Sequence, residues 1–146
     1  MFPLSTLHFQ LKGKGFPILC LHGHPGNSQC MSVFTNSLCQ NFQTIAPDLR
    51  GYGKSSTKTN FEITQHLIDL ETLLEQLQIS RYLILGWSLG GIIGMELALR
   101  NPEQVAGLIL IATAARPRSN HPPITWQDNL YTGLAAIINY FLPGWQ

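Results

Sequence analysis

The sequence predicts an α/β fold, in which a mostly parallel sheet lies between two layers of helices. Short apolar runs alternate along the chain with segments of helical periodicity, and each run is separated from the next by enough residues for a helical crossover. Strands connected in this way pair in parallel through right-handed crossovers. The composition, with 45% apolar and 12% charged residues, suits an interior that is covered on several sides. The 146 residues are enough for one compact domain.

In the first half of the chain, apolar runs and helical segments alternate twice. The predicted elements are a strand at 17–21, a helix from about 27 to 39, a strand at 44–47 and a helix at 63–77. Asn27 or Ser28 can cap the first helix, and Thr64 can cap the second. Apolar residues from Ile63 to Leu77 recur at steps of three and four, so they form one stripe of the second helix.

The second half continues the alternation and then changes character. Residues 82–85 predict a strand, 89–100 a helix, and 105–112 a strand of continuous apolar residues that we expect to be buried on both faces. Residues 114–123 form a segment rich in Pro and Arg, and residues 125–142 predict one or two helices with an apolar face.

Charge and composition exclude several classes of partner. The chain has 9 Lys and Arg against 8 Asp and Glu, a net charge of +1, which predicts neither a nucleic-acid partner nor an anionic membrane partner. The longest apolar run, 105–115, is too short to cross a bilayer. The start of the chain does not resemble a secretory leader, and the three cysteines cannot all pair, so we predict a cytoplasmic protein with reduced thiols.

The pentapeptide Gly86–Gly90, Gly-Trp-Ser-Leu-Gly, places Ser88 where a predicted strand turns into a predicted helix. A turn tight enough to expose one side chain at its apex brings the residues two before and two after against neighbouring backbone, which favours glycine. Ser88 is therefore the candidate nucleophile, and the N–H of Leu89 points toward the same space. The alternative is an ordinary turn in which the serine only caps the helix.

The segment His22–Gly26 follows the first predicted strand directly. Gly23 lets the chain turn away from the sheet, so the N–H of His24 can be aimed at the oxygen of a substrate carbonyl. For His22 we expect a buried ring that is hydrogen-bonded to backbone and holds the loop. Two histidines at this spacing also suggest a metal site, but no further cluster completes a coordination shell, so no metal or cofactor is predicted.

The loop Asp48–Ser55 contains Gly-Lys-Ser, which invites comparison with a phosphate-binding loop. The first glycine of that motif would fall at position 48, which is aspartate, so the comparison fails. We expect Asp48 and Arg50 to satisfy backbone groups or to pair with each other.

These three motifs, in this order, resemble the α/β-hydrolase family, in the esterase, epoxide-hydrolase and C–C-bond-hydrolase branch with a serine nucleophile. The resemblance covers about residues 17–113 and implies that residues 1–115 form part of the hydrolase core. It also implies that 116–146 begin a helical cap. Ser88 would be the nucleophile, and the N–H groups of His24 and Leu89 would form the oxyanion hole. Serine at position 88 argues against the family members in which an aspartate occupies this place.

The resemblance also implies a catalytic acid and a histidine that follow the nucleophile in the chain. The only histidine after Ser88 is His121, which follows no predicted strand, and no carboxylate follows the strand at 105–112. The chain therefore matches the first part of the family's architecture. We expect an N-terminal fragment that is inactive or weakly active alone.

The leading hypothesis is thus the N-terminal portion of a serine hydrolase that acts on a small ester, thioester or related carbonyl compound. A non-catalytic interaction module is the first alternative, because an exposed strand at 105–112 would pair with a second polypeptide that completes the fold. A cofactor-free lyase or synthase that uses the same serine is the second.

Overall fold

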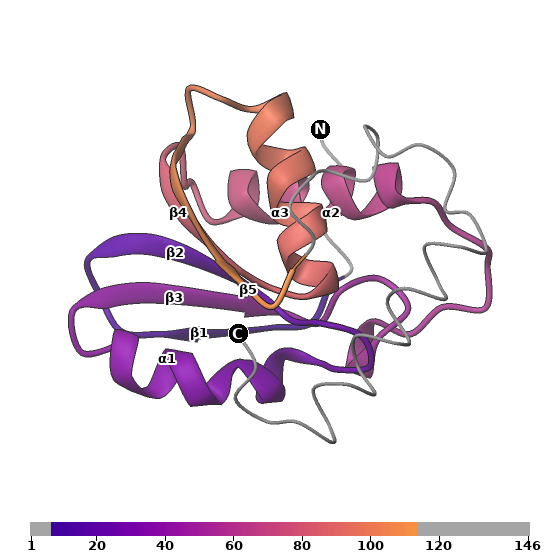
Figure 1. Cartoon of the computed structure of the whole chain (residues 1–146), viewed down its shortest axis with the longest axis horizontal. Helices are drawn as coiled ribbons and strands as arrows, with labels where there is room; N and C mark the ends of the chain where they lie inside the picture. The colour runs from indigo at the N-terminus through magenta and orange to yellow at the C-terminus, as the bar shows by residue number, and fades with distance from the viewer. Residues whose placement is uncertain (1–6, 114–146) are drawn as a thin grey trace, which may run out of the picture.

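The computed structural model describes residues 7–113, which form a five-stranded sheet with helices on both faces (Figure 1). The strands are β1 (Phe9–Lys12), β2 (Phe16–Leu21), β3 (Phe42–Pro47), β4 (Tyr82–Trp87) and β5 (Val105–Ile111), and the helices are α1 (Ser32–Leu38), α2 (Ile63–Gln76) and α3 (Leu89–Arg100), with short 3-10 turns η1 (Ser28–Met31) and η2 (Gly53–Ser55). The predicted α/β fold is confirmed. The boundary at residue 115 and the helices expected at 125–142 lie outside the described residues.

The strand order is β1-β3-β2-β4-β5, and every pair except β1–β3 is parallel. The antiparallel strand β1, with Phe9 opposite Pro47, was not predicted from the sequence. Its four residues alternate over too short a stretch to give a period. The carboxyl ends of β2, β3, β4 and β5 meet at one edge of the sheet, where the motif loops follow.

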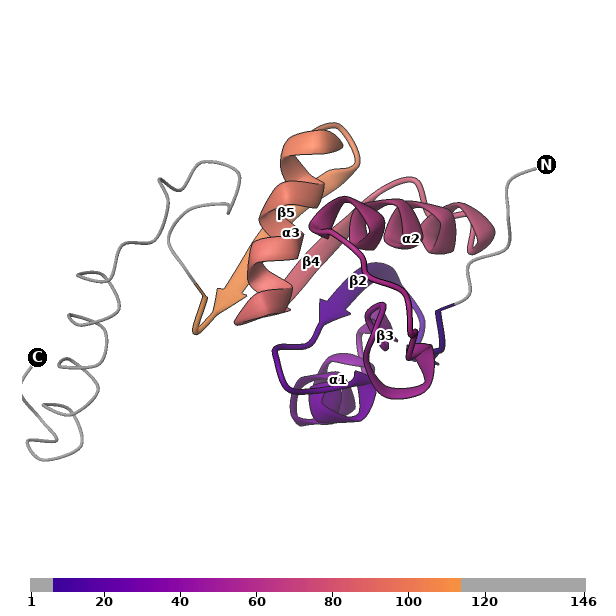
Figure 2. The ribbon, with the colours of Figure 1, turned by 90° about the vertical axis from the view of Figure 1, so that its right-hand side faces the viewer.

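The two faces of the sheet carry different helices, as the edge-on view shows (Figure 2). Leu19 and Leu21 of β2 pack in the cluster that includes the buried leucines of α2 and Leu97 of α3. The intervening Ile18 and Cys20 point the other way, into the cluster covered by α1. Alternation along one central strand therefore builds both halves of the core.

The expectation that β5 is buried on both faces is wrong. Leu108, Ile109 and Leu110 are 40%, 41% and 40% exposed. Within residues 7–113, β5 is an edge strand whose only strand partner is β4. A continuous apolar run usually marks a strand between two neighbours, but here only one side is paired in the described part.

The capping residue was predicted correctly for one helix and wrongly for the other. The side chain of Asn27 accepts hydrogen bonds from the N–H groups of Gln29 and Cys30, at 3.0 and 3.3 Å, so it caps the first helical turn. Thr64 does not cap α2. That helix begins at Ile63, where the side chain of Gln65 reaches back to accept the N–H of Glu62 at 2.7 Å.

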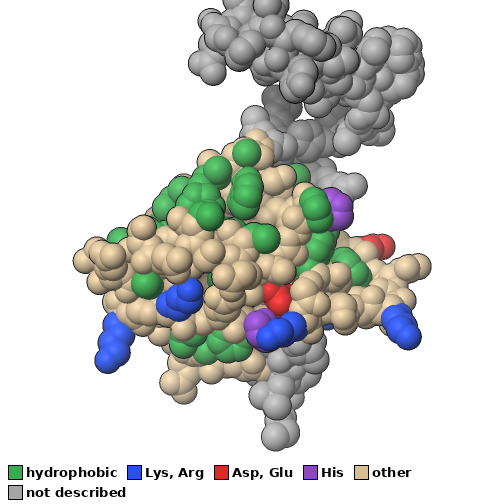
Figure 3. Space-filling model, turned by 90° about the horizontal axis from the view of Figure 1, so that it is seen from below, with side chains coloured by type: hydrophobic (Ala, Val, Ile, Leu, Met, Phe, Trp, Pro, Cys, Tyr) green, Lys and Arg blue, Asp and Glu red, His purple; other side chains and the backbone are tan. Residues whose placement is uncertain are grey.

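Charged side chains are sparse on the surface seen from the α1 side. In that view Lys and Arg are separated from one another, and apolar patches lie between them (Figure 3). No helix in the described part combines the length and apolar character that a bilayer crossing requires.

We expect Leu70→Ala to lower the free energy of unfolding by about 2–5 kcal/mol, because the side chain is fully buried between α2 and the sheet. Ile68 of the same helix is 50% exposed, so Ile68→Ala should change the free energy of unfolding by no more than about 0.5 kcal/mol. Urea unfolding followed by circular dichroism measures both. Equal losses in the two variants would contradict the assignment of the buried face of α2.

Candidate active site at the carboxyl edge of the sheet

Ser88 lies between the last residue of β4 and the first residue of α3, at the turn expected from the sequence. Its backbone has φ +52° and ψ −114°, a conformation that residues other than glycine rarely adopt. Residues at the end of β5 and just after it hold this strained serine. The N–H of Ser88 donates to the carbonyl of Ile111 at 2.9 Å, and the carbonyl of Ser88 accepts from the hydroxyl of Thr113 at 2.8 Å. Strain maintained by such surroundings is typical of functional turns.

The two glycines of the pentapeptide fit the steric argument made from the sequence. A Cβ at Gly86 would lie 2.5 Å from the Cα of Gly91, inside the same turn. A Cβ at Gly90 would collide with the backbone carbonyl of Leu21, at the end of β2. The start of α3 therefore packs directly on the central strand, and only glycine permits this approach.

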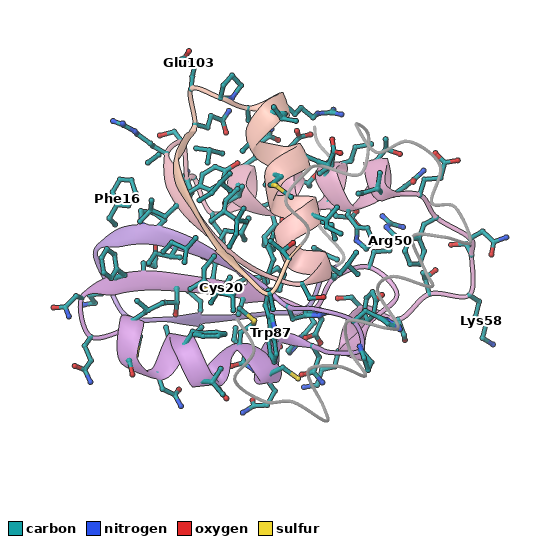
Figure 4. All side chains as sticks on the ribbon, in the orientation of Figure 1. Phe16, Cys20, Arg50, Lys58, Trp87 and Glu103 are labelled. Atoms are coloured by element: carbon teal, nitrogen blue, oxygen red, sulfur yellow. The ribbon has the colours of Figure 1, made fainter. Side chains whose placement is uncertain are left out.

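The loop 22–26 lies beside Ser88, as predicted. A Cβ at Gly23 would be 3.1 Å from Cβ of Ser88 and 3.7 Å from its Oγ. Together with Cys30 and Ala112, the two segments line an open cavity of about 240 Å³. Its lining residues are Gly23, His24, Pro25, Gly26, Cys30, Trp87, Ser88 and Ala112. Trp87 lies at the carboxyl end of β4 (Figure 4).

The sequence predicts oxyanion-hole donors at the backbone N–H groups of His24 and Leu89. His24 lines the cavity, and Leu89 follows Ser88 as the first residue of α3. The first N–H groups of an α-helix have no acceptor inside the helix, so that of Leu89 is available to a ligand. Such an arrangement can bind an oxygen that carries negative charge.

His22 is a buried structural residue, as expected from the sequence. Its Nε2 accepts the N–H of Leu49 at 3.0 Å, so Nδ1 carries the proton and donates to the carbonyl of Gly23 at 2.8 Å. Burial lowers the pKa of the ring, which keeps it neutral. Both ring nitrogens are occupied, so His22 is not available as a metal ligand. Residues 7–113 contain no group of three or more His, Cys, Asp or Glu side chains arranged for a metal ion.

Asp48 connects the loops on either side of the site. The buried carboxylate accepts the N–H of Ser28 at 2.6 Å and that of Lys54 at 2.8 Å, and it lies 3.2 Å from Nδ1 of His8. Burial alone would raise its pKa, but the hydrogen bonds and the nearby His8 outweigh burial and lower it. As expected, Asp48 satisfies backbone groups.

Arg50 and Tyr52 have partners that the sequence did not indicate. Arg50 forms a bidentate ion pair with Asp69 of α2, at 2.7 and 2.5 Å, instead of pairing with Asp48. The hydroxyl of Tyr52 lies 3.0 Å from Nδ1 of His24, and its ring contacts that of His22 edge-on. Asp69 is 21 residues after Asp48 on a separate element, so no local pattern links it to this loop.

A general base for Ser88 is not found in the described part of the chain. None of the hydrogen bonds made by His8, His22, His24 or His66 within residues 7–113 reaches Ser88. His121, which the sequence does not favour as the general base, lies outside the described residues.

Comparison with known proteins gives the same picture of the fold. The family model described as "alpha/beta hydrolase fold" matches residues 17–141. The pimeloyl-[acyl-carrier protein] methyl ester esterase of Vibrio atlanticus is 28% identical over 145 residues, which is 97% of this chain and 54% of that protein. Haloalkane dehalogenase 2 of Mycobacterium bovis is 32% identical over 108 residues, 73% of this chain and 38% of that protein.

Among solved structures, a thermophilic esterase from Thermogutta terrifontis is similar, with 28% identity and a TM-score of 0.74. The match covers 94% of this chain and 50% of the esterase. The chain spans between 31% and 54% of the length of the first curated relatives that it matches.

We expect the free energy of unfolding to fall as the pH decreases from 7.5 to 5.5. Burial lowers the pKa of His22 and of His66 below the ordinary value of 6.5, so the unfolded chain binds protons that the folded chain does not. The contribution of these two histidines to the free energy of unfolding is complete above pH 6.5. Below pH 6.5 it is lost, by at most about 1.4 kcal/mol per pH unit for each histidine.

Urea unfolding at a series of pH values measures this dependence. His22→Gln offers an amide oxygen to the N–H of Leu49 without titrating, so its slope should be smaller than that of the unmodified chain. A free energy that does not change across this pH range would contradict the assignment of neutral, buried histidines.

Proposed function

Because the chain belongs to the alpha/beta hydrolase fold family, we propose that it carries the nucleophile and the oxyanion hole of a serine hydrolase acting on a small ester or thioester. The observation that supports this most directly is the strained Ser88 at the β4–α3 turn, which faces a cavity shared with the loop 22–26. The similarity to esterases over most of the chain agrees with this chemistry.

In the proposed reaction, Oγ of Ser88 attacks the carbonyl carbon of the substrate and gives up its proton to a general base. The carbonyl oxygen becomes an oxyanion that accepts hydrogen bonds from the N–H groups of His24 and Leu89. Collapse of this intermediate expels the alcohol or thiol, which takes the proton from the base, and water then hydrolyses the acyl group from Ser88 by the same steps.

The general base and its orienting carboxylate would come from outside residues 7–113, in the protein as a whole or in a second polypeptide that completes the fold. We therefore propose that this chain alone is inactive or weakly active. Without its base, a serine hydrolase retains only the rate enhancement due to binding and the oxyanion hole, about 10³–10⁴-fold over water.

We expect the purified chain to hydrolyse p-nitrophenyl butyrate no faster than this residual level, and Ser88→Ala to leave that level unchanged, because it does not depend on the nucleophile. Imidazole added as an external base should accelerate hydrolysis by the unmodified chain but not by Ser88→Ala. Ser37→Ala, on the exposed face of α1, is the matched control and should have no effect. The rate of p-nitrophenol release, corrected for the buffer, measures all three. Equal imidazole-dependent rates for Ser88→Ala and the unmodified chain would refute the role of Ser88, whereas turnover at ordinary enzyme rates without imidazole would refute the missing base.

A second candidate function is supported by the exposed edge of β5. Three consecutive apolar residues, Leu108, Ile109 and Leu110, are about 40% exposed on a strand that lies at the sheet edge within residues 7–113, and such an edge favours pairing with another polypeptide. In this proposal the chain is an interaction module and Ser88 has no catalytic task.

The module proposal predicts that the chain associates at micromolar concentration and that Leu108→Lys reduces association, because a lysine on an edge strand opposes pairing. Leu99→Lys, at an exposed site of α3, should leave association unchanged. Sedimentation velocity distinguishes these species. A monomer that stays soluble at high concentration would contradict the module and leave the hydrolase proposal in place.

A further inference from the structure

The sheet face on the α1 side is covered by a helix over its inner strands. Phe34 and Leu38 of α1 pack against a cluster that includes Ile18 of β2 and Ala46 of β3. Figure 2 shows α1 beneath β2 and β3, with β5 on the far side of β4. Within residues 7–113, no helix lies over β5 on this face, and Ile109 there is 41% exposed.

Neighbouring residues of β5 point to opposite faces of the sheet. Ile109 is paired with Leu85, which belongs to the cluster on the α1 side. Leu108 is paired with Ile84, which belongs to the cluster under α2 and α3. Partners in adjacent parallel strands point to the same side of the sheet. Ile109 and Leu108 are 41% and 40% exposed, so they differ in the face that they occupy and hardly at all in exposure.

The α1 side of β4 and β5 is apolar throughout. Exposure increases away from α1, because Leu85, next to β2, is 3% exposed and Ile109, one strand farther out, is 41% exposed. None of the residues on this side is charged, and an uncharged surface that stays open to solvent is typical of an interaction site. We name it the β4–β5 face, and its residues are Leu83, Leu85, Trp87, Gly107, Ile109 and Ile111.

The chain itself supplies a segment that matches this face. Residues 114–146 follow β5 directly and lie outside the described residues. The sequence predicts one or two helices with an apolar face at 125–142, and Asp128 is the only charged residue there. Apolar residues in this segment recur at steps of four, four, three and four, which places them on one stripe of a helix. They are Trp126, Leu130, Leu134, Ile137 and Phe141.

We infer that residues 125–142 pack this apolar stripe on the β4–β5 face. The inference does not depend on the chemistry of Ser88. The seven residues of β5 span about 23 Å, and a helix over 125–142 would be about 27 Å long, enough to cover the strand. The connecting residues 114–124 can extend to about 36–40 Å, so the segment can reach any part of this face.

The covalent connection favours this segment over a separate partner. A short linker gives the attached segment an effective concentration in the millimolar range. A second polypeptide with an equally apolar stripe would need a similar free concentration to compete for the face. The family resemblance assigns residues 116–146 to the start of a cap, and the inference states which surface the apolar stripe of this segment covers.

The equal exposure of Ile109 and Leu108 provides the test. In the full chain, Ile109→Cys and Leu108→Cys each introduce a thiol, on opposite faces of one strand. N-ethylmaleimide labelling, quantified at each site by mass spectrometry, gives both rates. We expect the thiol at Ile109→Cys to react about tenfold more slowly than that at Leu108→Cys, because a segment that is bound for about nine-tenths of the time leaves the thiol accessible in one-tenth.

Two substitutions in the segment test its stripe without changing the sheet. Ile137→Lys places a charge on the stripe and should bring labelling at Ile109→Cys up to the rate at Leu108→Cys. Asn139→Lys, two residues further along on the opposite side of the predicted helix, is the matched control and should keep the slow rate. Cys20 is fully buried, so labelling of Cys20 would reveal a variant that has unfolded.

Hydrogen exchange of the chain without introduced cysteines gives a second measurement, which holds even if Ile109→Cys does not fold. Amides of residues 125–142 should be protected, and Ile137→Lys but not Asn139→Lys should remove the protection. The inference is overturned if both introduced thiols react equally fast, if Leu108→Cys is the slower, or if Ile137→Lys and Asn139→Lys act alike. It is also overturned if the protection increases with protein concentration, since a second copy would then be the occupant.

Discussion

The site depends on how closely the start of α3 approaches the central strand. A side chain at Gly90 would collide with the carbonyl of Leu21, so its absence lets α3 begin immediately over the end of β2. This approach forces the sharp turn in which Ser88 adopts φ +52°, and the backbone of Ile111 holds that turn through a hydrogen bond. If α3 moved outward, the turn would relax and Ser88 would no longer lie beside Gly23. The local strain at the serine is thus maintained by packing between two strands and a helix.

The loops around the turn are ordered mainly by buried polar groups. The carboxylate of Asp48 binds the N–H groups of Ser28 and Lys54, and the neutral ring of His22 joins the loop 22–26 to the N–H of Leu49. Each group connects chain segments that follow different strands, so the loops after β2 and β3 form one unit. Losing either group would leave buried donors unsatisfied. A rigid loop matters for the proposed chemistry because an oxyanion hole is effective only when its donors are already oriented.

At the carboxyl edge of the sheet, loops surround Ser88, whereas the apolar side chains of β5 are exposed. Around Ser88, the loop 22–26, Cys30 of η1 and Trp87 line a small open cavity. The side chains of Leu108 and Leu110 of β5 are exposed. Residues 7–113 supply no general base for Ser88. The described residues thus contain the serine turn and the loop 22–26 that lies beside it. The match to the esterase structure covers 50% of that protein.

The sequence by itself determined the fold class, four of the five strands, the position of Ser88 at a strand–helix turn and the structural role of His22, because these follow from periodicity and from short local motifs. It did not predict the short strand β1, the capping residue of α2 or the partner of Arg50. The ion pair between Arg50 and Asp69 joins a loop to a helix, and the cavity wall at Cys30 and Trp87 joins η1 to β4. The exposure of β5 was also decided by its place in the sheet, since an apolar run has the same pattern at the centre and at the edge. Such features depend on which segments meet in space, and no local spacing of residues records that.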